Sequence, residues 1–426
     1  MKQIAIMGHG IVGSGVAEVL TRHPQSIADR AGEELNIKYI LDIRDFLDSP
    51  LANRFTRDFE QIVNDPEICV VAEVMGGLEP AFPYVKRCLS AGKSVVTSNK
   101  ELVATHGQEL LELAREHNVN FLFEASVGGG IPIIRPLSQC MAANEIDEIQ
   151  GILNGTTNFI LTKMFGEQMP FEQALALAQE LGYAEKDPTA DVDGHDSCRK
   201  VCILASLTFG RHVYPGQVYT EGIRDITLND VEYAGAAGCV IKLIGRVSRL
   251  PDDRVSAAVY PALVARGSQL STVDDVYNAI LVRGDATGDV VFYGRGAGKL
   301  PTASAVVADI IDCVKHLAAR KYLYWADGQD HYVADHLDDV TRLFVRAKLH
   351  EERSKISVRH TFEAVSAGSK NVPNAASAPY TLLSRAGQPD DEVAFLTSTA
   401  TERELRQALD SLDDLITPIS ILHVVE

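Results

Sequence analysis

The segment 182–200 combines carboxylates and lysines in a spacing that could bind an amino acid and move a proton. It carries five carboxylates and two lysines, and it leads into a predicted helix over 196–209 whose later residues are mostly apolar. Asp196 and Lys200 are four residues apart and therefore share one face of that helix. Glu185 follows a different predicted helix and can fold toward the same face. Acids grouped around one lysine can hold the ammonium group of a substrate and leave the lysine beside the reacting carbon.

The same segment is also compatible with a solvated acidic loop and an ordinary ion pair. The functional interpretation is favoured because Lys200 borders apolar residues, which places it at the margin of a buried helix. Burial lowers the pKa of a lysine from about 10.4, whereas neighbouring acids raise it. The sequence therefore leaves the direction of the shift open.

A glycine loop near the N-terminus predicts a dinucleotide-binding site. Gly8-x-Gly10-x-x-Gly13 follows an apolar strand over 4–7 and opens a helical pattern. In this context glycine lets the backbone approach a pyrophosphate, whose charge the helix N-terminus stabilises. The sequence does not decide which residue contacts the ribose 2′ position, because Asp42 would favour NAD and Arg44 would favour NADP.

Three further polar segments lie at the ends of predicted elements. Thr97–Lys100 ends the fourth predicted strand, where ligands bind in such sheets, although a helix cap with an exposed lysine is the alternative. Glu124 precedes the glycine run 128–130, which could present carbonyl groups to a hard cation or act as a hinge. Asn154–Asn158 begins a helix, and its small polar residues suit either a cap or contacts to a carboxylate.

The elements that position these residues follow a strand–helix alternation. After the strand at 4–7, strands are predicted at 37–41, 68–74, 94–97 and 120–123. Helical patterns between them indicate a parallel, doubly wound sheet. Beyond residue 130 the pattern changes to a second, mixed sheet with strands at 146–153 and 290–293, helices at 171–181 and 196–209, and a helix after Pro301. A final α+β segment has predicted strands at 342–347, 355–358, 392–397 and 419–424, a helix at 402–415 and a loop at 366–378.

Composition excludes several classes of protein. The chain has 426 residues, 46% of them hydrophobic and 23% charged, which is typical of a globular protein with two or three domains. A net charge of −18 disfavours a nucleic-acid partner. Seven scattered cysteines without a secretion signal indicate reduced thiols and a cytoplasmic location, and no apolar run is long enough for a membrane span.

Taken in order, these motifs resemble those of the homoserine dehydrogenase family. The resemblance covers roughly residues 1–320, and its middle motifs are far more specific than the glycine loop. The matching segments are Gly8–Gly13, Met75–Gly77, Ser98–Lys100, Glu124 with its glycine run, Asn154–Asn158, Gly182–Pro188, Asp191–Lys200, Gly296–Gly298 and Pro301-Thr302.

The resemblance implies an oxidoreductase that transfers hydride reversibly between NADPH or NADH and L-aspartate 4-semialdehyde, giving L-homoserine on the route to threonine and methionine. It implies that Lys200 is the catalytic acid and base and that Lys100 assists at the same hydroxyl. The residues implied at the substrate are Glu185, Asp196, Asp191, Tyr183, Gly155 and Thr156. Those implied at the cofactor, NADP or NAD, are Gly8, Gly10, Ile11, Val12, Gly13, Arg44, Gly76, Ser98, Lys100, Gly296 and Gly298. Glu124 with the carbonyls of Val127, Gly129 and Ile131 would hold a monovalent cation, typically sodium, in a structural role.

The expected architecture is α/β, with a Rossmann-type parallel sheet, an α+β substrate and dimerisation domain, and a small C-terminal ACT-like α+β domain. The Rossmann-type domain is expected to span 1–130 and to be completed by a helix around 301–325. The substrate and dimerisation domain is expected over 131–300, a linker over 326–348, and the ACT-like domain over 349–426. In the ACT-like domain a long loop is expected in place of the first helix, so feedback inhibition by threonine is not expected. The resemblance also implies a homodimer or homotetramer, and with no kinase-like segment before the glycine loop, a monofunctional enzyme.

Two other functions compete with this interpretation. Another two-domain dehydrogenase, acting on a sugar or polyol, would lack the block from Glu185 to Lys200. A dinucleotide-sensing regulatory protein without turnover would not need every acid and lysine of that block. An absorbance assay of the nicotinamide with L-homoserine and either NAD or NADP separates the three.

Overall fold

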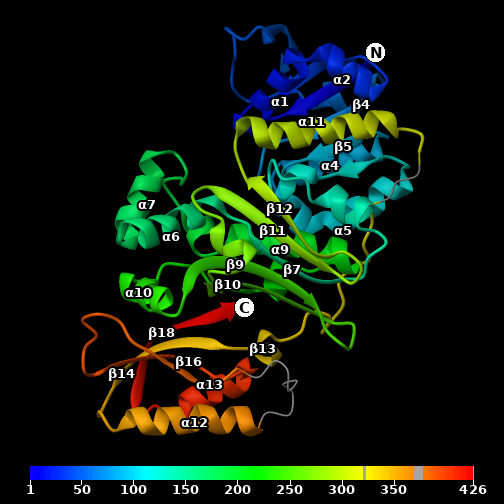
Figure 1. Ribbon diagram of the computed structural model, residues 1–426. Coiled ribbons are helices and arrows are strands. Elements are labelled where there is room, and N and C mark those ends of the chain that lie inside the picture. Colours follow the sequence, from blue (N-terminus) through cyan, green and yellow to red (C-terminus); the bar gives the residue numbers. More distant parts are fainter. Residues whose placement is uncertain (320–322, 369–377, 426) are drawn as a thin grey trace. The chain divides into compact units, whose positions relative to one another are not determined.

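The structure is a computed structural model that describes residues 1–319, 323–368 and 378–425 (Figure 1). The chain divides into two compact units, each assembled from separate segments. The first unit comprises Met1–Ile149, Arg199–Gln217 and Asn278–Asp330, and the second comprises Gln150–Cys198, Val218–Tyr277 and His331–Glu426. One change of unit falls inside helix α9 (His195–Phe209), between Cys198 and Arg199.

A parallel sheet of six strands forms the centre of the first unit. Its strands are β1 (Lys2–Met7), β2 (Leu35–Leu41), β3 (Phe55–Thr56), β4 (Ile68–Glu73), β5 (Ser94–Thr97) and β6 (Phe121–Leu122). Their order is β3-β2-β1-β4-β5-β6, and every pairing between neighbours is parallel. This is the strand order of a doubly wound dinucleotide-binding sheet, which confirms the expected Rossmann-type fold.

Helices cover this sheet, and one of them comes from far along the chain. The helices are α1 (Ile11–Arg22), α2 (Pro24–Ala31), α3 (Glu60–Val63), α4 (Ala81–Ser90), α5 (Lys100–Glu116) and α11 (Lys299–Lys315). Helix α11 packs against α1 (Figure 1). The approach requires a glycine, because a Cβ on Gly15 would lie 2.7 Å from the carbonyl oxygen of Lys299.

The other elements of the first unit precede and follow α9. They are the short helices η2 (Glu124–Ser126), η3 (Pro136–Cys140) and η4 (Pro215–Gln217), and the strands β11 (Tyr277–Gly284) and β12 (Gly288–Arg295). Strand β7 (Ile146–Ile152) is divided between the two units after Ile149, and Tyr277 at the start of β11 belongs to the second unit. Strands β11 and β12 are neighbours, and β12 is the edge of its sheet. Both strands that the sequence predicts for the second sheet, at 146–153 and 290–293, are present as β7 and β12. Strand β11 was not predicted.

The second unit contains a mixed sheet in the order β9-β10-β18-β14-β16-β15. Its strands are β9 (Cys239–Arg249), β10 (Val255–Ala265), β14 (Leu343–Leu349), β15 (Thr381–Leu383), β16 (Glu392–Leu396) and β18 (Ile416–Val425). The remaining elements are α6 (Gly155–Glu167), α7 (Phe171–Glu180), α8 (Thr189–Val192), β8 (Tyr219–Thr220), α10 (Leu228–Ala236), η5 (Gln269–Thr272), η6 (His336–Asp338), β13 (Val340–Thr341), α12 (Ser354–Gly368), β17 (Ala400–Thr401) and α13 (Glu402–Asp410). Because β18 pairs with both β10 and β14, the C-terminal strands continue the sheet of the β9–β10 hairpin.

The C-terminal segment follows the order β14-α12-β15-β16-α13-β18, with both helices on one side of the strands (Figure 1). This βαββαβ arrangement is ferredoxin-like. Two expectations for it were wrong: residues 355–358 are not a strand, and no long loop replaces the first helix, because 354–368 form α12. Val358 and Phe362, four residues apart, are buried as the apolar face of that helix. Most of the loop predicted over 366–378 lies outside the described residues, and an ACT-like identity stays a prediction.

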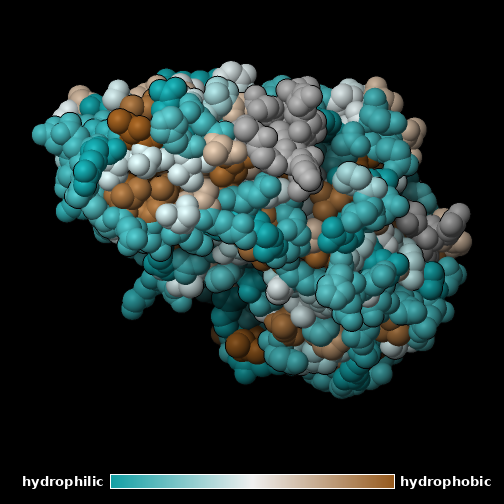
Figure 2. All heavy atoms as spheres, turned by 90° about the horizontal axis from the view of Figure 1, so that it is seen from below, coloured by the Kyte–Doolittle hydropathy of each residue, from teal (hydrophilic) through white to brown (hydrophobic). Residues whose placement is uncertain are grey.

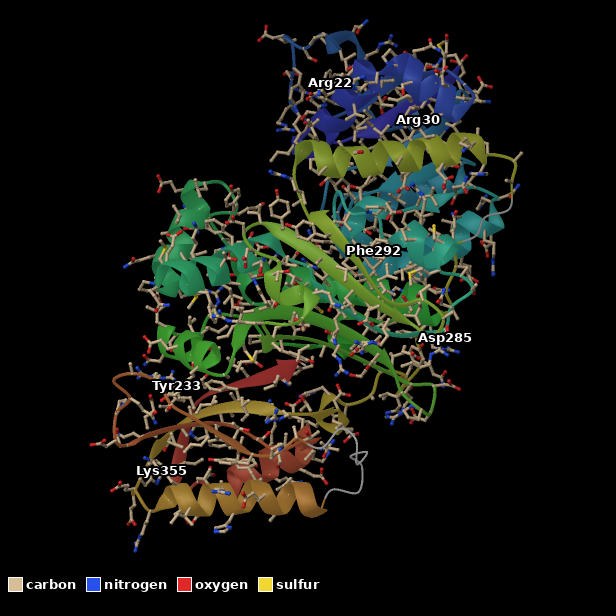
Figure 3. All side chains as sticks on the ribbon, viewed as in Figure 1. Arg22, Arg30, Tyr233, Asp285, Phe292 and Lys355 are labelled. Carbon is tan, nitrogen blue, oxygen red and sulfur yellow. The ribbon has the colours of Figure 1, made fainter. Side chains whose placement is uncertain are left out.

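A buried group of charged side chains connects α10 to the C-terminal strands, and we call it the Arg346 cluster. Its members are Arg346, Asp230, Glu392, Arg385 and Tyr233. Arg346 Nε donates to Asp230 Oδ1 over 2.9 Å, and Arg346 Nη1 donates to Glu392 Oε2 over 3.3 Å. Tyr233, labelled in Figure 3, donates from its hydroxyl to Glu392 Oε1 over 2.8 Å. The cluster therefore fixes strands β14 and β16 to α10.

The surface is more hydrophilic than the buried cores of the two units. On the coloured part of the face in Figure 2, hydrophilic residues predominate and hydrophobic residues form separate patches. Among the helices of the described ranges, none is long and apolar enough to cross a lipid bilayer.

Candidate functional site

The glycine loop between β1 and α1 has the geometry of an anion-binding turn. Gly8 has a φ of +98°, and a Cβ on Gly13 would lie 2.0 Å from the carbonyl oxygen of Gly8. In contrast, a Cβ on Gly10 would meet nothing within 4 Å. The first turn of α1, which includes Ile11 and Val12, has no acidic residue. The loop is thus tight on its inner side and open beside the helix N-terminus, which fits a cofactor pyrophosphate.

Asp42 and Arg44, the two candidates for the ribose, form one ion pair just after β2. Arg44 Nε donates to Asp42 Oδ1 and Arg44 Nη2 to Asp42 Oδ2, both over 2.9 Å. The backbone N–H of His9 also donates to Asp42 Oδ2 over 2.7 Å. Bonding to Arg44 holds the pKa of the Asp42 carboxyl far below its usual range. Only 6% of the Asp42 side chain is exposed against 57% for Arg44, so the guanidinium is the more accessible group.

An aromatic cluster beside this pair was not predicted from the sequence. The rings of Phe46 and Phe55 stack with centroids 4.7 Å apart, and His9 meets both edge-on at 4.8 and 4.9 Å. Burial lowers the pKa of His9. The only signal in the sequence was the histidine inside the glycine motif, since the two phenylalanines come from a segment without a recognisable pattern.

The loops after β4 and β5 are connected by Glu73, another residue that sequence reasoning missed. Glu73 is fully buried, and burial raises its pKa. Its carboxylate accepts from the backbone N–H of Met75 over 2.8 Å and of Gly76 over 3.3 Å, and from Thr97 Oγ1 over 2.5 Å. The signal that could have found it is a single acid inside an otherwise apolar strand.

Asn99 completes the connection between the same loops. Its Nδ2 donates to the carbonyl of Gly77 over 2.6 Å, and its Oδ1 accepts from the N–H of Leu102 and so caps α5. Lys100 is the first residue of α5, and both Lys100 and Ser98 are half-buried. The predicted helix cap is therefore present, and it places Ser98 and Lys100 on either side of a fixed residue.

Glu124 uses its side chain to hold the backbone that follows the glycine run. Its Oε1 accepts from the N–H groups of Ile133 and Ile134 over 2.6 and 2.8 Å, and its Oε2 accepts from that of Arg135 over 3.0 Å. Asp309, which pairs with Arg135, accepts from the Glu124 N–H over 2.8 Å, and burial raises the pKa of Asp309 to about 7.

The backbone of the glycine run has a different environment from the Glu124 side chain. Gly128 and Gly129 have φ values of +72° and +54°, which let the chain reverse here. In the part of the chain that the structure describes, no hydrogen bond ends on the carbonyl oxygens of Val127, Gly129 or Ile131. Likewise, no group of three or more His, Cys, Asp or Glu side chains forms a metal site among the described residues. Because the Glu124 carboxylate accepts three backbone N–H groups, the carbonyl oxygens of this segment are the candidate cation ligands.

In the second unit, Asn154 brings two predicted substrate residues together, and we call this group the Asn154 cluster. Asn154 Nδ2 donates to Asp191 Oδ1 over 2.7 Å and to Asp196 Oδ2 over 3.0 Å. Its Oδ1 accepts from the N–H of Thr157 over 2.9 Å and thereby caps α6. Asn154 and Asp196 are 5% and 6% exposed. Two carboxylates from α8 and α9 are thus held by one amide at the start of α6.

The other predicted substrate residues of this unit lie at the start of α6 and in the segment between α7 and α8. Thr156 Oγ1 donates to the carbonyl of Tyr183 over 2.6 Å, and Gly155 is the first residue of α6. The side chain of Glu185 is exposed, and its carbonyl accepts from Gln179 Nε2 over 3.0 Å. The structure therefore joins Asp191 with Asp196 and Thr156 with Tyr183, whereas Glu185 stays at the surface.

Lys200 lies one turn after Asp196 on helix α9, as predicted. It is 8% exposed, and the residues that follow it, from Val201 to Ala205, are buried. By the division of the chain, Lys200 and Lys100 belong to the first unit and Asp196 to the second. The continuous helix is the element that fixes the spacing of Asp196 and Lys200.

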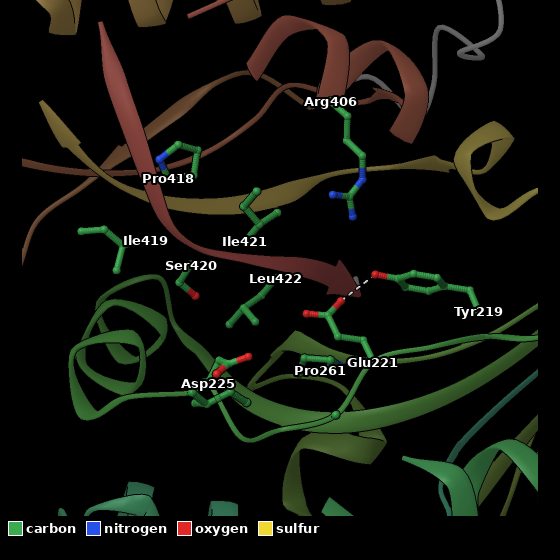
Figure 4. A pocket seen from close by; sticks show the side chains of 12 residues that line it. Tyr219, Glu221, Asp225, Pro261, Arg406, Pro418, Ile419, Ser420, Ile421 and Leu422 are labelled. Carbon is green, nitrogen blue, oxygen red and sulfur yellow. Dashed lines mark hydrogen bonds between the residues drawn. The ribbon is translucent and has the colours of Figure 1, made fainter. Parts of the chain in front are cut away.

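The second unit also has a cavity of about 300 Å³ that none of the predicted residues lines (Figure 4). Its lining includes residues of β8 and β18, which both pair with β10. Pro261 and Pro418 lie in its wall, and neither has an N–H with which to close a ladder between the strands. Arg406, which projects into the cavity from α13, is paired with Glu402 at 2.6 Å.

Comparison with known proteins identifies the family. A model described as the NAD binding domain of homoserine dehydrogenase matches residues 8–124, and a model described as homoserine dehydrogenase matches residues 132–311. The homoserine dehydrogenase of Synechocystis sp. is 46% identical over 321 residues, which are 73% of this chain and 73% of the relative. That of Mycobacterium tuberculosis is 37% identical over 420 residues, or 97% of this chain and 94% of the relative.

Solved structures give the same result. A homoserine dehydrogenase from Thiobacillus denitrificans has a TM-score of 0.87 and 33% identity, and the match covers 100% of this chain and 98% of the other. A hyperthermophilic archaeal homoserine dehydrogenase mutant in complex with NADPH has a TM-score of 0.62 and 30% identity, covering 74% of this chain and 98% of the other. The chain therefore belongs to the homoserine dehydrogenase family and is an NAD(P)-dependent oxidoreductase.

Proposed function

We propose that Lys200 donates and accepts the proton in the interconversion of L-homoserine and L-aspartate 4-semialdehyde, and that Asp191, Asp196 and Glu185 hold the substrate's ammonium group. One observation carries this proposal. Asn154 holds Asp191 and Asp196 side by side, and Asp196 lies one turn before the buried Lys200 on α9. This arrangement supports the proposal, because a cation-binding group and a proton carrier would then be one helical turn apart.

The proton chemistry follows from the lysines. In the direction of reduction, the ammonium of Lys200 donates a proton to the carbonyl oxygen, and in the direction of oxidation its free amine removes that proton from the hydroxyl. Lys100, which begins α5 behind the cap of Asn99, assists at the same oxygen. When bound, the nicotinamide cofactor supplies or accepts the hydride.

The carboxylate end of the substrate would lie at the N-terminus of α6. The backbone N–H groups of Gly155 and Thr156 are in the first turn of that helix, where no carbonyl of the helix itself can accept from them. Asn154 Oδ1 takes the next N–H, that of Thr157. A carboxylate is favoured at such a position, and Tyr183 is held nearby by its bond to Thr156.

The test of Lys200 is the substitution Lys200→Ala. We expect turnover to fall by on the order of 10² to 10⁴, because proton transfer is lost, while cofactor affinity stays nearly unchanged. The control is Lys186→Ala, which removes an exposed lysine from the same acidic segment. Near-normal turnover of the Lys200 variant in the absorbance assay with L-homoserine would exclude the assigned role.

We propose that NADP or NAD binds along the carboxyl ends of the parallel strands. Gly8, Gly10, Ile11, Val12 and Gly13 would contact the pyrophosphate, Gly76 and Ser98 the nicotinamide half, and Gly296 and Gly298 its far side. The open space at Gly10 supports the first contact, and the φ of +128° at Gly298 supports a close backbone approach.

Arg44 would bind the 2′-phosphate of NADP, since its guanidinium is exposed whereas Asp42 is covered by it. We expect Arg44→Ala to raise the KM for NADP about tenfold and to leave that for NAD nearly unchanged. The control is Arg22→Ala, at the exposed end of α1 (Figure 3). Equal effects on both cofactors would contradict the assignment of Arg44.

A monovalent cation, with sodium as the first candidate, is proposed at the carbonyl oxygens of Glu124, Val127, Gly129 and Ile131. The support is that those of Val127, Gly129 and Ile131 accept no hydrogen bond within the described ranges. Hard cations prefer such oxygen ligands. A rise of the thermal midpoint in NaCl over choline chloride at equal ionic strength is the expected result, and identical midpoints would contradict it.

We also propose a homo-oligomer, as a dimer or tetramer. Among the described strands β12 has no outer neighbour, and it exposes 37% of Val291 and 56% of Tyr293, which are large apolar surfaces for an edge strand. Light scattering of the purified protein is the measurement. Val291→Lys should lower the mass if this edge forms the interface, and a monomeric parent protein would end the proposal.

A further inference from the structure

The two ends of the Asn154 side chain have separate tasks in the structure. Oδ1 accepts from the N–H of Thr157 over 2.9 Å and from Thr157 Oγ1 over 3.2 Å, so the oxygen is committed to the start of α6. That commitment decides the orientation of the amide, because its nitrogen must then point away from the helix. Nδ2 has two N–H groups, and it donates to two carboxylates, at 2.7 and 3.0 Å.

We propose that Asn154 is a positioning residue that sets the separation and orientation of Asp191 and Asp196 for the substrate's ammonium group. The inference rests on the proposed function of those two carboxylates. Both distances end on the same nitrogen, so the two carboxylates are held near each other although Asp191 lies on α8 and Asp196 on α9. Two negative groups so close repel one another, and the shared donor offsets part of that repulsion.

Only asparagine meets both requirements at this position. Serine and aspartate cap helices as well as asparagine does. A serine hydroxyl, however, has one donor, and an ionised carboxylate has none. Aspartate also has nearly the same shape as asparagine but would add a third negative charge beside Asp191 and Asp196. The capping task and the bridging task can therefore be separated by substitution.

The experiment compares Asn154→Ser, Asn154→Asp and Asn154→Ala by steady-state kinetics and thermal unfolding. We expect Asn154→Ser to keep the thermal midpoint and to raise the KM for L-homoserine on the order of tenfold, with kcat changed much less. Asn154→Asp should raise this KM further, on the order of a hundredfold, because of the added charge. Asn154→Ala should show the raised KM together with a lower thermal midpoint, because the cap is lost as well.

The matched control is Asn158→Ser, one turn along the same helix. Asn158 is 1% exposed, and its amide donates to the backbone carbonyls of Val273, Asp275 and Tyr277 at 3.0 to 3.1 Å, not to carboxylates. We expect this variant to lose thermal stability and to keep the KM. If it raises the KM as Asn154→Ser does, the effect is general loosening and the positioning role is overturned.

Two outcomes separate this inference from the proposed function on which it rests. If Asp191→Asn leaves the KM unchanged, the assignment of the carboxylates to the ammonium group fails, and the positioning role fails with it. If Asp191→Asn raises the KM while Asn154→Ser and Asn154→Asp bind homoserine like the parent protein, the carboxylates keep their role and Asn154 is only a helix cap.

Discussion

The Arg346 cluster and the Asn154 cluster both lie in the second unit, but the groups that donate hydrogen bonds to their carboxylates differ in charge. In the Arg346 cluster, guanidinium groups meet carboxylates, with Arg346 2.9 Å from Asp230 and Arg385 3.1 Å from Glu392. In the Asn154 cluster, a neutral amide connects two carboxylates. An amide can satisfy one oxygen of each carboxylate but cannot cancel its charge. The Arg346 cluster therefore holds α10 and two strands together, whereas the proposed role of the Asn154 cluster is to bind the substrate's ammonium group.

The largest change in stability is expected from Arg346→Leu, which tests whether the Arg346 cluster holds α10 to the strands. Arg346→Leu leaves the fully buried Asp230 without its cation, and Glu392, of whose side chain 8% is exposed, keeps only Arg385. We expect the free energy of unfolding to fall by about 3–5 kcal/mol. Urea denaturation measures it, with Lys348→Ala on the exposed side of the same strand as control. A loss no greater than that of the control would mean that the cluster does not hold α10 to the strands.

A second prediction tests the proposed binding role of the carboxylates in the Asn154 cluster. Asp196→Asn removes a negative charge and keeps the shape of the side chain, so we expect the KM for L-homoserine to rise about 10- to 100-fold while the thermal midpoint falls less than with Arg346→Leu. Kinetics and calorimetry on the same preparation check both statements. A drop in thermal stability as large as that of Arg346→Leu would place this cluster in the same class as the Arg346 cluster, and the comparison would fail.

Glu185 has the same proposed partner as Asp196 but a different environment. Its side chain is exposed, so water and ions screen its attraction for the ammonium group. We expect Glu185→Leu to raise the KM for homoserine only about two- to fivefold, well below the effect of Asp196→Asn. The exposed Glu172→Leu on α7 is the control. An unchanged KM would remove Glu185 from the site.

In the first unit, the carboxylates of Glu124, Asp309 and Asp312 lie around the guanidinium of Arg135, and this third cluster gives a pH-dependent prediction. The pKa of Asp309 is raised by burial to about 7 from an ordinary value of 3.8. The folded state therefore binds this proton more tightly than the unfolded state, and the stabilisation is complete below about 3.8 and is lost as the pH rises through about 7.

The substitution Asp309→Asn should accordingly flatten the pH dependence of the thermal midpoint between about 4 and 7. The exposed Asp29→Asn on α2 should leave that dependence as it is. If the Asp309 variant keeps the slope of the parent protein, this carboxyl is ionised in the folded state and the cluster resembles the Arg346 cluster after all.

Much of the fold could be predicted because the first unit follows local rules. Each predicted strand of the parallel sheet is present, since an apolar run between turn signals has few alternatives there. Strands β9 and β10 were not predicted. Strand β10 is buried almost throughout and contains several alanines and Pro261, so neither alternation nor strand propensity marks it. Helix α12 was missed because Lys355–Val358 alternates over a short stretch, and the longer helical spacing to Phe362 decides the structure.

In the candidate site, too, local spacing could be predicted from the sequence but long-range contacts could not. The acids and lysines of segment 182–200 could be found because their spacing is local. The bond from Asn154 to Asp196 spans 42 residues, and the sequence offered only two equal interpretations of Asn154–Asn158. Similarly, Glu73 binds Thr97, 24 residues away, across two strands whose pairing the sequence predicts but whose side-chain contacts it does not. Long-range side-chain contacts depend on the folded backbone, so they were out of reach.

The contact between α1 and α11 limits how this protein can be dissected or recombined. A fragment that stopped at Ile149 would keep every strand of the parallel sheet but would lose α11, whose backbone at Lys299 comes so close to Gly15 that no side chain fits between them. The apolar flank of α1 would then face water, and such a fragment would be prone to aggregate. A portable dinucleotide-binding module cut from this chain would have to carry the segment from Asn278 onward, spliced behind the first.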